Sequence, residues 1–162
     1  MNNLICIIPA RKGSKRIKNK NIKLFYGKPI ISHVIEKLKK FKMFSKIYVT
    51  TDCRNIEKIA QKYKIGIIKR GKILSNDFTD TKTVVVDAIK KLERKKLNFE
   101  FVCCVYPTSI FIKKKYFNFS LKKIQKDKLD FMFSAKKYDH SIFRSFYQGV
   151  NKIIFPIFKN KK

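Results

Sequence analysis

The chain has 162 residues, enough for one domain with a sizeable core, and its 44% hydrophobic content excludes a disordered protein. Its 40 Lys and Arg against 11 Asp and Glu give a formal net charge of +29, a value typical of proteins that bind nucleic acid. Only six of the cations are Arg, and the Lys residues are spread along the whole chain. We therefore attribute the charge to a compositional bias at solvated positions and expect no specific nucleic-acid partner.

The sequence offers no membrane-spanning or secretory signal. No apolar run approaches the roughly 18 residues that a spanning helix needs, and the amino terminus has neither a basic leader nor a cleavage site. The two His residues are too few and too isolated for a metal cluster. None of the four cysteines forms a C-x-x-C pair, so we expect reduced core cysteines in a cytoplasmic protein: Cys6, Cys53, Cys103 and Cys104.

The amino-terminal stretch combines a buried strand with a basic loop. Leu4–Ile8 is continuously apolar, and the loop that follows is rich in cations and small polar residues. Gly13 would let the backbone approach a ligand, and Ser14 and Asn21 offer uncharged hydrogen bonds. Four cations could neutralise phosphates: Arg11, Lys15, Arg16 and Lys20. The loop indicates a phosphate site; a solvated basic loop is the alternative.

The next segments alternate between helix and strand. Apolar spacing predicts a helix from about Pro29 to Phe41, a strand over Lys46–Asp52 and a third strand over Gly66–Ile68. Between these strands lies a helix that Asp52 could cap and whose inner face is Ile56, Ile59, Ala60 and Tyr63. This β-α-β-α-β order predicts an α/β fold with a mostly parallel sheet.

A long polar connection over residues 69–81 breaks this rhythm, and loops of this length are usually functional or disordered. It leads into a helix capped by Asp80 or Thr81, with an apolar stripe formed by Val84, Val85, Ala88, Ile89 and Leu92. An apolar strand over Phe101–Tyr106 follows and stops at Pro107.

The remaining chain contains three predicted elements. A helix from about Lys114 to Lys126 would bury Phe117, Leu121 and Ile124. Asp130–Ala135 is predicted as a strand, and Arg144–Tyr147 with Ile153–Pro156 as a short hairpin.

Several short motifs occur in a fixed order. They are Ile8-Pro9-Ala10-Arg11, Gly13-Ser14-Lys15-Arg16-Ile17, Lys20-Asn21, Gly27-Lys28-Pro29-Ile30, Thr50-Thr51-Asp52, Arg70, Leu74-x-x-Asp77 and Thr79-x-Thr81. Together they resemble the nucleotide-binding signature of the nonulosonic acid cytidylyltransferases, the CMP-N-acetylneuraminate synthetase-like family. The segments Cys103–Thr108 and Tyr138–Phe146 are most similar to the branch that acts on pseudaminic acid.

The resemblance implies a Rossmann-like three-layer nucleotide-diphospho-sugar transferase fold, with residues 1–162 as a single nucleotidyltransferase-like domain truncated at its carboxyl end. It implies a cytoplasmic enzyme that transfers CMP from CTP to a nine-carbon 2-keto sugar acid, and it leaves a homodimer open. Mg²⁺ is the implied cofactor, but the family's metal-binding segment is missing from this chain, so the metal position stays unknown.

The resemblance also assigns residues. Arg11 and Lys20 would be catalytic, and the nucleotide would be bound by Ala10, Arg11, Gly13, Ser14, Lys15, Lys20, Asn21, Arg70, Thr79, Thr81 and Tyr106. Plainer interpretations stay open: Asp52 and Asp77 could cap helices, Arg70 could be a solvated cation, and Tyr106 could be strand-end packing. Two other functions also stay open, a CTP-binding domain without catalysis and a polyanion-binding protein.

Overall fold

The structure is a computed structural model that describes residues 3–14, 17–137, 139 and 145–158. The chain divides after Tyr116 into two compact units. All site residues predicted from the sequence belong to the first unit.

The first unit is built on a four-stranded sheet. Its strands are β1 (Leu4–Pro9), β4 (Lys46–Thr51), β5 (Gly66–Lys69) and β6 (Phe101–Cys104), in the order β5-β4-β1-β6. Every neighbouring pair is parallel; for example, Ile7 of β1 pairs with Tyr48 of β4 and Cys104 of β6. The predicted parallel sheet is confirmed, and the polar loops after β1 and β4 meet at its carboxyl edge.

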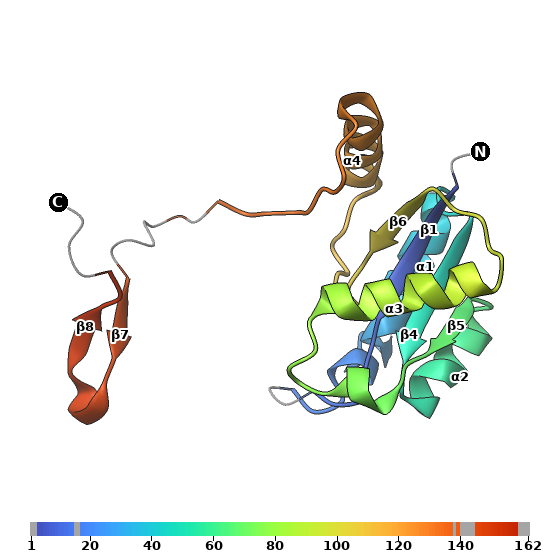
Figure 1. Ribbon diagram of the computed structural model, residues 1–162. Helices are drawn as coiled ribbons and strands as arrows, with labels where there is room; N and C mark the ends of the chain where they lie inside the picture. Colours follow the sequence, from blue (N-terminus) through green and yellow to red (C-terminus); the bar gives the residue numbers. More distant parts are fainter. Residues whose placement is uncertain (1–2, 15–16, 138, 140–144, 159–162) are drawn as a thin grey trace. The chain divides into compact units, whose positions relative to one another are not determined.

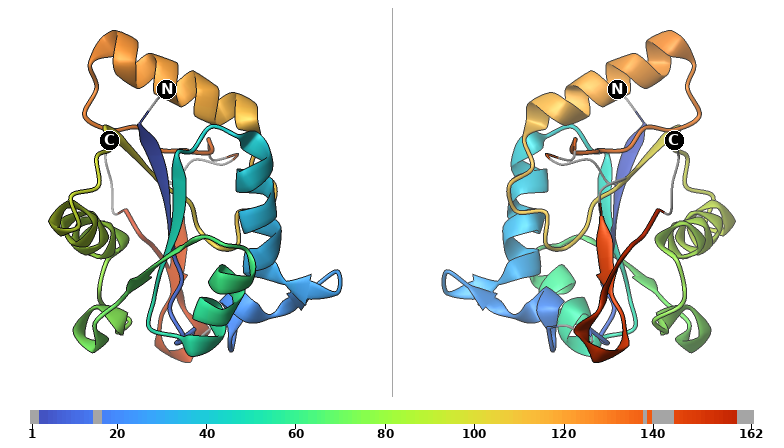
Figure 2. Two further views of the ribbon diagram at one scale, coloured as in Figure 1. Left: turned by 90° about the vertical axis from the view of Figure 1, so that its right-hand side faces the viewer. Right: turned by 90° about the vertical axis from the view of Figure 1, so that its left-hand side faces the viewer.

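Helices cover both faces of this sheet (Figures 1 and 2). Helices α1 (Ile30–Phe41) and α2 (Arg54–Lys62) lie on one face, and α3 (Thr81–Arg94) lies on the other. Because side chains alternate along a strand, Ile5 and Ile7 of β1 pack with Ala88 and Leu92 of α3. The neighbouring Cys6 and Ile8 are fully buried and point toward the α1 face. The three-layer α/β fold is therefore confirmed for this unit.

The start of α3 agrees with the sequence prediction, whereas the start of α1 differs from it by one residue. Asp80 caps α3, since its carboxylate accepts a 2.7 Å hydrogen bond from the Thr83 amide, and this bond lowers the pKa of Asp80. Helix α1 begins at Ile30 and not at Pro29, because Pro29 belongs to a small antiparallel hairpin of β2 (Leu24–Phe25) and β3 (Lys28–Pro29).

The cysteine prediction holds in part. Cys6 and Cys53 are buried free thiols, and Cys103 is half-buried. Cys104 is exposed, so its placement in the core was wrong. It lies on β6, which has a neighbouring strand on one side only in the described sheet and is therefore covered less than the central strands.

The second unit contains most of α4 (Lys114–Asp127) and an antiparallel hairpin of β7 (Phe146–Gln148) and β8 (Ile154–Pro156). The predicted helix and hairpin are confirmed. The buried face of α4 is not: Phe117, Leu121 and Ile124 are only half-buried.

The predicted strand over Asp130–Ala135 is wrong. Phe131 and Phe133 are 72% and 78% exposed, and the segment joins no ladder among the described strands. An extended segment becomes a strand only when it pairs with another one. Within the described residues, no helix is long and apolar enough to cross a membrane.

Candidate functional site

The loop after β1 is held in place by hydrogen bonds at successive residues. The Ala10 amide donates to the Thr50 carbonyl at 3.0 Å, which extends the pairing of β1 and β4. The side-chain amide of Asn21 then donates to the Arg11 carbonyl, also at 3.0 Å. Asn21 is 6% exposed, so it supports the loop from inside the protein.

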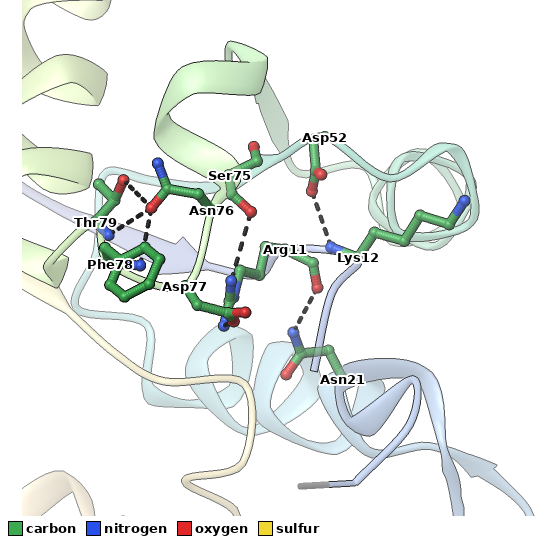
Figure 3. A network of polar contacts seen from close by, with 9 residues as sticks. All are labelled: Arg11, Lys12, Asn21, Asp52, Ser75, Asn76, Asp77, Phe78 and Thr79. Atoms are coloured by element: carbon green, nitrogen blue, oxygen red, sulfur yellow. Dashed lines mark hydrogen bonds and ion pairs between the residues drawn. The ribbon is translucent and has the colours of Figure 1, made fainter. Parts of the chain in front are cut away.

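The next residue of the loop is held by an acid. The Lys12 amide donates to Oδ1 of Asp52 at 2.9 Å (Figure 3). The expectation that Asp52 caps the following helix was wrong: the residue at the amino-terminal boundary of α2 is Cys53, which makes no side-chain cap. Asp52 sits one position before that boundary, so its carboxylate reaches across to β1's loop instead.

A cavity of about 550 Å³ opens beside this loop. Its lining comes from the loop after β1, from the end of β4 and from the long connection after β5: Arg11, Lys12, Gly13, Ser14, Lys18, Asn19, Asp52, Ser75, Asn76 and Asp77. The cavity lies at the carboxyl end of the parallel strands, where open α/β sheets bind their ligands. Arg11, Gly13 and Ser14 are the predicted site residues that line it.

Arg11 joins two of the three segments that line the cavity. Its guanidinium forms an ion pair with Asp77 and also donates to the Ser75 carbonyl at 3.4 Å (Figure 3). Both side chains of the ion pair are 28% exposed. Asp77 caps no helix in the described structure, so the capping interpretation is wrong for this residue as well.

The connection around Asp77 is ordered by the residue before it. Oδ1 of Asn76 accepts hydrogen bonds from the Phe78 and Thr79 amides at 2.8 and 2.7 Å, and from the Thr79 hydroxyl at 2.9 Å. Its Nδ2 donates to the Ile73 carbonyl at 2.7 Å. Such an Asx turn fixes the local backbone without a helix or strand.

Arg70 follows β5 and is buried, with 8% of its surface exposed. Its Nη2 donates to the Thr50 carbonyl at 2.9 Å, while its Nε finds no hydrogen-bond partner in the described part of the chain. Burial lowers the pKa of the guanidinium, although the charge of Asp52 opposes that shift. The alternative of a solvated cation is therefore wrong, and Arg70 ties the ends of β4 and β5 together.

The other predicted residues are not among those that line the cavity. Thr81 and Tyr106 place their hydroxyls 2.9 Å apart, which joins the start of α3 to the segment after β6. Ala10 is fully buried, and Lys20 is exposed in a short 3-10 turn over Lys20–Ile22.

The predicted site residue Lys15 and its neighbour Arg16 lie outside the described residues. So do Tyr138, His140 and Arg144 of the segment that is similar to the pseudaminic acid branch. The sequence interpretation missed Lys12, Lys18, Asn19, Ser75 and Asn76 as lining residues. The length of the polar connection was the one signal that pointed to the last two.

The described residues do not fit a preformed Mg²⁺ site. No group of three or more His, Cys, Asp or Glu side chains comes together among them. The two carboxylates at the cavity are engaged with protein donors, Asp52 with the Lys12 amide and Asp77 with Arg11.

A sequence profile described as "Cytidylyltransferase" matches residues 5–147. The chain belongs to this family. The match includes all the segments that line the cavity, so the basic loop and the connection after β5 are parts of a cytidylyltransferase domain.

Two relatives with named activities align with most of this chain. The chain is 36% identical over 153 residues to a pseudaminic acid cytidylyltransferase of Campylobacter jejuni, covering 93% of this chain and 66% of that protein. It is 34% identical over 111 residues to a CMP-N,N'-diacetyllegionaminic acid synthase of Legionella pneumophila, covering 68% and 48%. The chain thus spans 66% and 48% of the lengths of these two relatives.

Solved structures support the fold. A CMP:2-keto-3-deoxy-manno-octonic acid synthetase complexed with CTP aligns with a TM-score of 0.65 at 23% identity, over 77% of this chain and 48% of that one. A cytidylyltransferase from Leptospira borgpetersenii aligns with a TM-score of 0.62 at 20% identity, over 79% and 51%.

Proposed function

We propose that this chain binds CTP at the cavity beside the loop after β1 and transfers CMP to a nine-carbon 2-keto sugar acid. The anomeric 2-hydroxyl oxygen of the sugar forms a bond to the α-phosphorus of CTP. The bond between that phosphorus and the oxygen bridging to the β-phosphate breaks, pyrophosphate leaves, and the proton of the sugar hydroxyl passes to solvent water. Such a transfer depends on positioning and charge neutralisation more than on covalent help from the protein.

The observation that carries the proposal is the loop itself. Three hydrogen bonds hold its backbone from Ala10 to Lys12, so Gly13 and Ser14 are presented to the cavity by a fixed segment. Arg11 and Lys20 would neutralise the phosphates, with Lys15 adding charge. Arg70, Thr79, Thr81 and Tyr106 would lie near the ribose and cytosine.

For the acceptor we propose pseudaminic acid. The support is the Campylobacter jejuni relative, which carries that name and aligns over 93% of this chain. The Legionella pneumophila relative is named for a different sugar acid of the same general kind, so the sugar must be tested directly.

The test is pyrophosphate release by the purified chain with CTP and Mg²⁺, comparing pseudaminic acid with N-acetylneuraminic acid at high salt. Release with pseudaminic acid is the expected result. Release with N-acetylneuraminic acid alone would show that the acceptor is N-acetylneuraminic acid and not pseudaminic acid. Stabilisation against heat by CTP without release would indicate a binding domain that performs no chemistry. Steeply salt-dependent binding with no preference for CTP would indicate a polyanion-binding protein.

A further inference from the structure

The cavity is lined by two carboxylates, which a simple phosphate site would not require. Asp52 and Asp77 both line it, although the whole chain has only 11 acidic residues against 40 basic ones. A carboxylate near bound phosphate is unfavourable because like charges repel. Asp52 has an evident role, since it holds the Lys12 amide. The role of Asp77 needs another explanation.

Asp77 is presented to the cavity by an ordered turn. The side chain of Asn76 bonds to two main-chain amides after Asp77 and to the Ile73 carbonyl before it. Arg11 comes from the opposite side, where β1 ends and Asn21 holds its carbonyl. The ion pair thus joins two fixed segments 66 residues apart (Figure 3). Because both backbones are held, the carboxylate of Asp77 and the guanidinium of Arg11 face each other from fixed positions.

Asp77 occupies part of the Arg11 guanidinium, the group that a bound phosphate would also use. Arg11 donates through Nη2 to the Asp77 carboxylate and through Nη1 to the Ser75 carbonyl. Its side chain also lines the cavity and is 28% exposed, so an anion from solvent can reach it. A bound phosphate must therefore share the guanidinium with Asp77 or displace it.

We propose that Asp77 is an intramolecular competitor for Arg11 that weakens the hold on phosphate and so promotes the release of pyrophosphate. As pyrophosphate begins to dissociate, the Asp77 carboxylate pairs again with the Arg11 guanidinium, and the anion loses its main bidentate partner. The identity of the leaving anion rests on the proposed function. The competition itself needs only a phosphate ligand.

The test measures binding of inorganic pyrophosphate and of CTP to the chain by calorimetry at fixed ionic strength. Asp77→Asn should tighten pyrophosphate binding about three- to fivefold, the size of a partly exposed ion pair. Asp77→Ala should act in the same direction, and thermal unfolding establishes that each variant is folded. Unchanged or weaker binding in both variants would overturn the proposal, because Asp77 would then position Arg11 for the ligand.

Two controls separate competition from a general charge effect. Asp87→Asn removes the same charge and an ion pair of 2.8 Å with Lys91, but Asp87 does not line the cavity, so binding should stay unchanged. In an Arg11→Ala background, Asp77→Asn should lose its effect, because the partner for which it competes is gone. An effect that persists there would contradict the mechanism.

The outcomes also separate this proposal from the proposed function. Turnover of CTP without tighter pyrophosphate binding in Asp77→Asn rejects the competition alone. Tighter pyrophosphate binding in a chain that does not bind CTP rejects the nucleotide assignment alone. A wild-type chain that binds neither ligand rejects both.

Discussion

The side-chain amide of Asn21 holds the main-chain carbonyl of Arg11, ten residues earlier, through a hydrogen bond of 3.0 Å. Asn21 is buried and does not line the cavity, whereas Arg11 does. The residue therefore connects the 3-10 turn over Lys20–Ile22 to the loop that carries the guanidinium. Its effect on a phosphate ligand would pass through the backbone of that loop.

Asn21→Ala should weaken CTP binding about tenfold and lower the free energy of unfolding by about 1–3 kcal/mol, because the Arg11 carbonyl loses its donor. Asn21→Asp should do no better, since a carboxylate cannot donate to a carbonyl. Calorimetry with CTP and chemical denaturation measure the two effects. Asn55→Ala, on the exposed surface of α2, is the control and should leave CTP binding unchanged. Wild-type affinity in Asn21→Ala would exclude the supporting role.

If the proposed function is right, Lys20→Ala should lower turnover by on the order of 100-fold, because Lys20 would then neutralise charge on the transferring phosphate. Lys20 is exposed at the start of its turn, so folding should be unaffected. The measurement is the rate of pyrophosphate release at saturating CTP and sugar. Lys23→Ala removes an equal charge just after the turn and should keep wild-type turnover. Equal rates in the two variants would contradict the catalytic role assigned to Lys20.

The fold of the first unit could be predicted because its signals are local. Strand β1 is an apolar run, and α3 begins after a capping acid, Asp80, and carries an apolar stripe at helical spacing. The basic loop after β1 could be placed at the ligand edge because parallel strands deliver their loops there.

The contacts that build the cavity could not be predicted, because they join residues far apart in the sequence. Asp52 precedes a helix, so a capping role fitted the local pattern, yet its partner is the Lys12 amide 40 residues away. The pairing of Arg11 with Asp77 has no local signal either. The wrong strand over Asp130–Ala135 has the same cause, since the sequence shows β-propensity but not whether a partner strand exists.

Gly66→Ala should destabilise the protein by about 1–3 kcal/mol, because the new methyl group would lie 2.2 Å from Cδ1 of the Tyr48 ring. Gly66 pairs with Tyr48 across β5 and β4, so neither backbone can easily move away. Gly71→Ala is the matched control: nothing lies within 4 Å of its added methyl group, and its φ of −65° suits alanine. Urea denaturation of both variants measures the difference. Equal stabilities would contradict the packing argument.

Lys96→Gly should stabilise the protein by about 0.5–1 kcal/mol. Lys96 follows α3 with a φ of +55°, in the left-handed region that glycine adopts without strain. The same substitution at Lys90, inside α3, should instead destabilise by about 1 kcal/mol, because glycine is a poor helix former. Thermal midpoints should therefore move in opposite directions for the two variants. A lower midpoint for Lys96→Gly would show that its charge at the helix end matters more than backbone strain.

Tyr63→Phe should make the stability of the protein less dependent on acid pH. The carboxylate of Glu36 pairs with Lys28 and accepts a 2.7 Å hydrogen bond from the Tyr63 hydroxyl, and these partners lower its pKa from the ordinary 4.5. A carboxyl with a lowered pKa in the folded state stabilises the protein above pH 4.5, and this contribution is lost as the pH falls through the lowered value. Without the Tyr63 hydroxyl, the pKa of Glu36 should move back toward 4.5.

The measurement is the free energy of unfolding of both proteins from about pH 6 to about pH 3, with the Glu36 carboxyl followed by NMR. Wild type should be more stable by about 1 kcal/mol at the upper end, the usual value of one hydrogen bond, and the two curves should converge as Glu36 becomes protonated. Tyr26 is 86% exposed, so Tyr26→Phe removes a hydroxyl at the surface and should leave the wild-type curve unchanged. Parallel curves for wild type and Tyr63→Phe would mean that Lys28 alone sets the pKa of Glu36.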